Sequence, residues 1–117
     1  MSISLLKKFL PISLALLLYY GSASRFTHGA TSTESFYRYQ NDRSPDDGST
    51  LSYVIPIFDL IIGTAILRPG LSRKVAVCFV ASTITSVAAQ RFTAGLDCQG
   101  DMLQAIWATV TAIVVLS

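Results

Sequence analysis

Apolar residues gather in four stretches that are separated by polar segments. They cover about residues 3–20, 51–67, 75–90 and 102–117. A helix needs about 20 residues, with a range near 17 to 25, to cross the hydrocarbon core of a bilayer. None of the four shows the strict alternation of apolar and polar residues that is typical of a half-buried strand. The pattern predicts an all-α fold, an integral membrane bundle of four transmembrane helices in a single domain over residues 1–117.

Composition supports a lipid environment. The chain is 51% hydrophobic and 14% charged, whereas a soluble domain usually has about 25% charged residues. A net charge of +2 without a basic stripe argues against nucleic acid as a partner. Cys78 and Cys98 lie near opposite ends of the third stretch, too far apart for a disulfide. The lipid bilayer is the expected partner, and no cofactor or metal site is expected, because clusters of metal ligands and phosphate-binding glycine loops are absent from the sequence.

Turn and capping residues flank these stretches. The segment 46–50, Asp-Asp-Gly-Ser-Thr, offers N-cap chemistry before the second stretch. Arg68-Pro69-Gly70 should end that helix, because proline cannot continue it. Asp101 is the expected N-cap of the fourth helix.

Charge placement predicts the orientation. Lys7, Lys8, Arg68, Arg73 and Lys74 fall on one side, +5 with no acid. The other side carries four arginines and six acids, 4 − 6 = −2, and Asp59 accounts for the remaining −1 of the net +2. The positive-inside rule then places both termini in the cytosol. The short stretches favour the thinner endoplasmic reticulum membrane over the plasma membrane.

The first stretch has a second interpretation. Lys7 and Lys8, an apolar run and Ser22-Ala23-Ser24 also resemble a secretory signal peptide over residues 1–24 with a small-residue cleavage site. An uncleaved helix is the favoured alternative. The orientation of the other three helices is the same in both cases.

The polar segment 21–50 is expected to lie outside. Thr31 and Glu34 have the spacing of a capping box, which predicts a short interfacial helix near residues 32–40. Aromatic side chains favour the boundary between membrane and water, and this segment supplies Phe36, Tyr37 and Tyr39. A flexible solvated loop is the alternative. His28, the single histidine, is expected to be an ordinary surface residue.

Asp59 is the candidate functional residue. It lies eight residues from either end of the second stretch, so it should sit near the bilayer midplane and face the bundle interior. Ser52, Pro56 and Gly63 share its helix face. Two interpretations stay open. Asp59 is either a polar fastener between helices or a catalytic acid, base or ligand contact, and no second ionisable group is obvious near it.

Phe58-Asp59-Leu60-Ile61-Ile62-Gly63, the Arg-Pro turn and Arg73-Lys74 together resemble the DoxX-like group of small four-helix membrane proteins. The resemblance covers mainly residues 51–117. It implies a compact four-helix membrane bundle. It implies little about activity, because members of that group have varied roles.

Three functions compete. The first is an accessory or catalytic component of a biosynthetic pathway that handles a lipophilic small molecule, with Asp59 as acid or base. Its expected binding residues are the polar side chains of the third and fourth helices and the aromatic residues above them: Ser82, Thr85, Gln104, Thr111, Phe36, Tyr37 and Tyr39. The second is a structural partner of a larger membrane enzyme. The third is a proton-coupled transporter, similar to the small multidrug-resistance family. Soluble-enzyme motifs are absent, so catalysis itself stays open.

Overall fold

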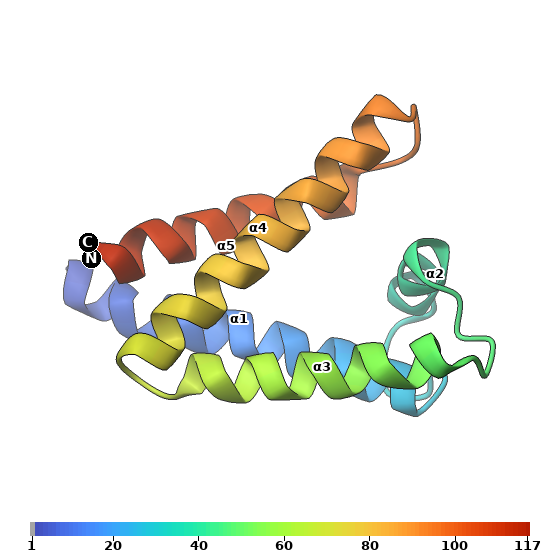
Figure 1. Cartoon of the computed structure of the whole chain (residues 1–117), viewed down its shortest axis with the longest axis horizontal. Coiled ribbons are helices and arrows are strands. Elements are labelled where there is room, and N and C mark those ends of the chain that lie inside the picture. Colours follow the sequence, from blue (N-terminus) through green and yellow to red (C-terminus); the bar gives the residue numbers. More distant parts are fainter. Residues whose placement is uncertain (1) are drawn as a thin grey trace. The chain divides into compact units, whose positions relative to one another are not determined.

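The computed structural model describes residues 2–117, which form five helices and their connecting loops (Figure 1). The helices are α1 (Ile3–Phe26), α2 (Glu34–Arg43), α3 (Thr50–Leu67), α4 (Leu71–Thr93) and α5 (Gln99–Leu116). They make the chain 80% helical, and no strand occurs within residues 2–117. Four of them, α1, α3, α4 and α5, are long and apolar enough to cross a membrane. The predicted all-α fold with four such helices is confirmed.

Several predicted helix boundaries change, including both ends of α4, which begins at Leu71 and ends at Thr93 and not at residues 75 and 90. Helix α1 continues through Ser22 and Ser24 to Phe26 and does not end at residue 20. The N-cap of α2 is Thr33, whose hydroxyl accepts a hydrogen bond from the Phe36 amide at 3.2 Å, so the capping box expected at Thr31 was placed two residues early. Cys98 is the N-cap of α5. Asp101 is therefore not the cap but lies in the first turn, where an acid still complements the helix dipole.

The chain divides into two compact units. We call Ala15–Thr64 the cap unit, because it contains the short helix α2. We call Met1–Leu14 with Ala65–Ser117 the hairpin unit, because it contains the consecutive helices α4 and α5. Helix α1 contributes its first half to the hairpin unit and its second half to the cap unit.

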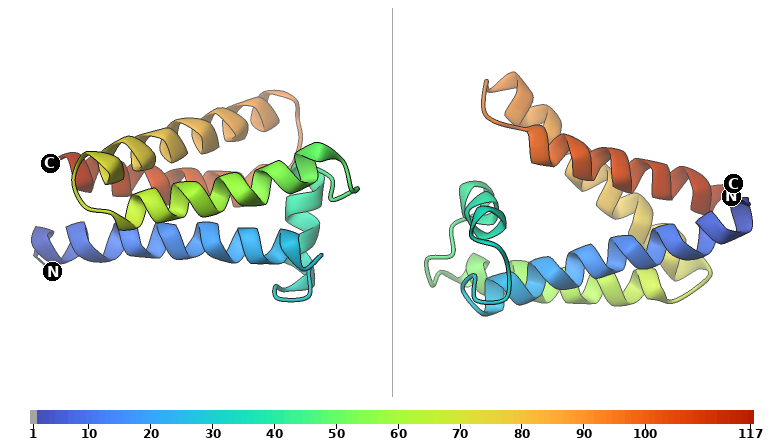
Figure 2. Two further views of the ribbon diagram at one scale, coloured as in Figure 1. Left: turned by 60° about the horizontal axis from the view of Figure 1, so that its bottom comes forward. Right: turned by 180° about the vertical axis from the view of Figure 1, so that it is seen from behind.

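In the hairpin unit, α4 and α5 lie side by side in opposite directions (Figure 2). Small side chains on both helices are buried, among them Ala88 on α4 and Ala108 on α5. Small residues let helix backbones approach closely, which is how helices associate in lipid. The first half of α1 joins α5 through Ser13, whose hydroxyl accepts a hydrogen bond from Trp107 Nε1 at 3.0 Å.

In the cap unit, the second half of α1 and α3 lie side by side in opposite directions, and α2 crosses their end (Figure 2). Ser22 Oγ donates to the Pro56 carbonyl at 2.8 Å, and the hydroxyls of Tyr19 and Thr64 are 2.8 Å apart. A Cβ at Gly63 would lie 2.9 Å from Tyr19 Cε1, so only glycine lets α3 come this close to the tyrosine ring.

Candidate functional site

A cluster of polar side chains lies where α1 ends and α2 crosses it, and Arg25 forms its buried base. Only 7% of Arg25 is exposed. Its Nη2 donates to the Gln40 carbonyl and its Nη1 to the Ser44 carbonyl, both at 3.1 Å. These carbonyls belong to the end of α2, where the helix dipole is negative. Arg25 therefore adds charge-assisted hydrogen bonds to the carbonyl end of α2 and fixes α2 to α1.

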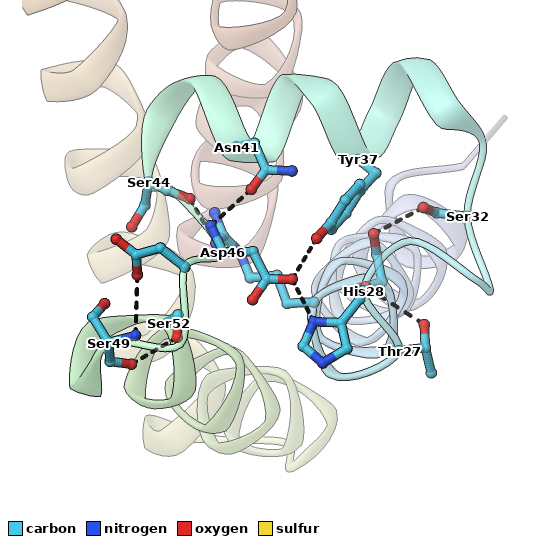
Figure 3. Close-up of polar contacts among 12 residues, drawn as sticks. Thr27, His28, Ser32, Tyr37, Asn41, Ser44, Asp46, Ser49 and Ser52 are labelled. Carbon is cyan, nitrogen blue, oxygen red and sulfur yellow. Dashed lines mark hydrogen bonds and ion pairs between the residues drawn. The ribbon is translucent and has the colours of Figure 1, made fainter.

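The other hydrogen bonds of the cluster involve Asp46 (Figure 3). Its Oδ2 accepts hydrogen bonds from the Tyr37 hydroxyl and, at 2.7 Å, from Nδ1 of His28. Its backbone amide donates to Asn41 Oδ1 at 2.7 Å. One buried carboxylate thus ties the loop after α2 both to α2 and to the loop after α1.

His28 is held in an unusual conformation. Its φ of 53° lies in the left-handed region, which few residues other than glycine adopt. Its ring is 67% exposed, while only 4% of the Asp46 side chain is. His28 is therefore a surface residue, as expected, but one that is oriented by a buried acid.

The charge state of the cluster follows from these contacts. Burial opposes ionisation of Asp46, but the hydrogen bonds from Tyr37 and His28 lower its pKa below the ordinary value of 3.8. The hydrogen bond to Asp46 raises the pKa of Tyr37 above 10.0, and burial acts in the same direction. At neutral pH Asp46 is therefore an acceptor-only carboxylate and Tyr37 a neutral donor.

His28 and Asp46 are arranged like a general base, the histidine, and the carboxylate that orients it. No serine or cysteine side chain hydrogen-bonds to His28 in the described part of the chain. The pair therefore lacks a nucleophile, and its evident role is to hold two loops together.

Asp59 lies on α3 in the cap unit and is half-buried. Within that unit its carboxyl makes no hydrogen bond, and its electrostatic partner is Arg25. The expectation of no ionisable neighbour was wrong. Because the first helix was expected to end at residue 20, Arg25 was assigned to the outer loop. In fact Arg25 lies on α1, alongside α3. The available signal was a basic residue shortly after the end of the apolar run, separated from it only by small residues.

The four polar residues predicted on the last two helices all belong to the hairpin unit, whereas Asp59 belongs to the cap unit. Ser82 and Thr85 line one open groove of about 480 Å³ together with small residues of α4 and Thr109 of α5. Gln104 and Thr111 do not line it. Thr111 is buried and donates to the Trp107 carbonyl of its own helix at 2.7 Å.

The three predicted aromatic residues all lie on α2 but have different roles. Phe36 packs between Tyr20 and Tyr39, with ring centroids 4.8 and 6.1 Å apart. Tyr37 instead donates to Asp46. The Arg43 guanidinium lies 3.7 Å from the centre of the Tyr39 ring. Sequence reasoning found these aromatic residues and missed the buried polar network beside them.

Within residues 2–117, no three histidine, cysteine or acidic residues come together in a way that could hold a metal ion, and Cys78 and Cys98 are free. No family model, curated protein or solved structure matches the chain. The resemblance to the DoxX-like group stays a prediction.

Proposed function

We propose that this is a multi-pass membrane protein that serves a biosynthetic pathway for a lipophilic small molecule, as an accessory or catalytic component. The observation that carries this proposal is the state of Asp59. It lies in the middle of an apolar helix, yet it makes no hydrogen bond in its own unit. An acid that served only to fasten helices would use its oxygens for hydrogen bonds.

Inserting an acid into a membrane span costs free energy, so such residues are found mainly where they serve a function. An acid in a span is therefore a functional candidate by default. A free carboxyl can accept or donate a proton at a carbon or oxygen atom of a substrate that enters from the bilayer. Arg25 supplies a positive charge to the same unit, which balances the carboxylate when the site is empty. Proton transfer of this kind serves isomerisation, cyclisation or dehydration.

The proposed topology has four crossings. Lys7 at the start of α1 donates to the Ser117 carbonyl at the end of α5, which supports a common side for both ends. With the positive-inside rule, this side is the cytosol, and α2 lies on the opposite side. The short helix α3, at 18 residues, favours the endoplasmic reticulum.

The test is complementation of a deletion strain with Asp59→Asn, followed by metabolite profiling. The proposal predicts that Asp59→Asn accumulates a pathway intermediate inside the cells, that Asp59→Glu restores part of the flux, and that protein levels stay normal. Asp47→Asn is the matched control, because it makes the same chemical change in an exposed loop. Wild-type profiles from Asp59→Asn would contradict the proposal, and intracellular retention of the finished product would instead identify a transporter.

The groove on α4 and α5 favours a second candidate, a structural partner of a larger membrane enzyme. Its lining consists of small and hydroxyl-bearing residues: Ala81, Ser82, Thr85, Ser86, Ala89 and Thr109. Such a surface admits a transmembrane helix of another protein at close range. Ser82→Leu with Ser86→Leu should then abolish co-purification of that enzyme, whereas Asp59→Asn should leave it intact.

A further inference from the structure

A small basic cavity lies in the hairpin unit. It has a volume of about 150 Å³ and is lined by Lys7, Gly70, Arg73, Lys74 and Val115. Three of these five residues are cationic and none is acidic. They come from the start of α1, the turn before α4, the first turn of α4 and the end of α5. Two separate helices, α1 and α4, thus bring positive charge to one cavity.

Two of the cations are held in place by helix ends. Lys7 Nζ donates to the Ser117 carbonyl after α5. Arg73 Nε and Nη2 donate to the carbonyls of Ile66 and Leu67 at 2.7 and 3.3 Å, where α3 ends. A lysine has three N–H donors and an arginine five. Both side chains therefore keep donors for a ligand while their position is fixed.

The start of α4 forms part of the cavity lining. Gly70 is its N-cap, with φ 93°, and it has no side chain to accept a hydrogen bond from the first turn. The first N–H groups of a helix have no acceptor within the helix, and the helix dipole is positive at this end. Lys74, in the same turn, is exposed. Such convergence of N–H groups and cations is typical of phosphate sites.

We infer that this cavity binds a phosphate group. Its volume of about 150 Å³ corresponds to roughly five water molecules in the liquid. That space accommodates one phosphate, while anything attached to the phosphate must extend outside. Because the cavity lies at the ends of three candidate membrane spans, the phosphate can come from a lipid headgroup such as that of phosphatidic acid, or from inorganic phosphate in solution.

The experiment uses the full chain in nanodiscs of phosphatidylcholine with increasing fractions of phosphatidic acid. The readout is the midpoint of thermal unfolding, and the fraction that gives a half-maximal shift measures affinity. A second titration adds inorganic phosphate to discs of pure phosphatidylcholine. A shift with lipid alone identifies the headgroup as the source, and a shift in both titrations shows that free phosphate also binds. No shift in either overturns the inference.

Lys74→Gln is the first variant, because Lys74 does not cap a helix end and both caps stay intact. The matched control is Lys8→Gln with Arg68→Gln, which removes two exposed cations that do not line the cavity. Loss of one charge-assisted contact should weaken phosphate binding about tenfold. The control should stay within about twofold of the wild type at fixed salt. An equal loss in the control would show that general surface charge attracts the anion, which would contradict a built site.

Discussion

In the cap unit, polar side chains reach from one helix to another, whereas several hydroxyls of α4 and α5 in the hairpin unit bond to their own helix. Ser22 on α1 donates to α3, and Gln40 on α2 donates to α1 through the Gly21 carbonyl at 2.9 Å. By contrast, Thr83 and Thr111 each donate to a carbonyl four residues earlier. Hydroxyls therefore join helices in the cap unit, whereas α4 and α5 are joined by small side chains and by the ion pair between Arg91 and Asp101, at 3.4 Å.

This difference determines which substitutions should lower the stability of the fold. Interhelical hydrogen bonds between buried groups specify one arrangement, because an unpaired partner remains behind when one side is removed. When a hydroxyl that bonds to its own helix is removed, the carbonyl that accepted its hydrogen bond is still paired with a backbone N–H of that helix.

The largest effect is expected at Arg25. Arg25→Met removes two charge-assisted hydrogen bonds to the end of α2 and should lower the free energy of unfolding by about 3 kcal/mol. Arg38→Met is the control, because Arg38 is 74% exposed and pairs with Glu34 on the surface. Its cost should stay below about 0.5 kcal/mol. Unfolding in detergent, followed by circular dichroism, compares the two, and equal costs would contradict a structural role for the buried arginine.

The next effect is expected at Gly63. Gly63→Ala places a methyl group 2.9 Å from the Tyr19 ring, which must move and lose its contact with Thr64. Overpacking of this kind costs about 1 to 3 kcal/mol. Combining it with Tyr19→Leu should recover most of the loss, because the ring is then absent. A double variant no more stable than Gly63→Ala alone would show that the close approach of α1 and α3 is not the cause.

Two hydroxyls give the direct test of the comparison. Ser22→Ala leaves the buried end of α1 without its bond to Pro56 and should cost about 1 kcal/mol, allowing for the modest value of hydrogen bonds in membranes. Thr83→Ala removes a bond within α4 and should change stability by less than about 0.5 kcal/mol. Urea or detergent titration measures both, and the comparison fails if the order is reversed.

The smallest and most local effect concerns pH. The pKa of Asp46 is lower in the folded chain than its ordinary value of 3.8, so the carboxylate stabilises the fold above that pH. This contribution should be lost as the pH falls from 3.8 through the lowered pKa. Near-ultraviolet circular dichroism of the tyrosines reports on the cluster. Asp46→Asn should remove this acid transition, and its persistence in the variant would assign it to other groups.

The helices themselves could be predicted from the sequence, because apolar runs of this length have few alternatives in lipid. The polar network could not. Arg25 looked like a loop residue until α1 was seen to extend past Tyr20, and the Asp46 contacts join residues 18 and 9 positions apart through loops without periodicity. Spacings of four and three residues along the sequence identified the face of α3 that carries Pro56 and Gly63. They carried no information about which partner reaches each residue.

Thiol labelling in sealed vesicles tests the central claim, that Asp59 lies within a membrane-spanning helix between a polar cap and a basic end. Cys78 and Cys98 are first changed to serine. Three variants then each carry one new cysteine, in place of Ser35, Asp59 or Gly70. A membrane-impermeant maleimide is added from one side of the membrane at a time. The account predicts that the cysteines at positions 35 and 70 react from opposite sides. The cysteine at position 59 should react only after the bilayer is dissolved. Labelling of position 59 in intact vesicles, or of positions 35 and 70 from the same side, would contradict it.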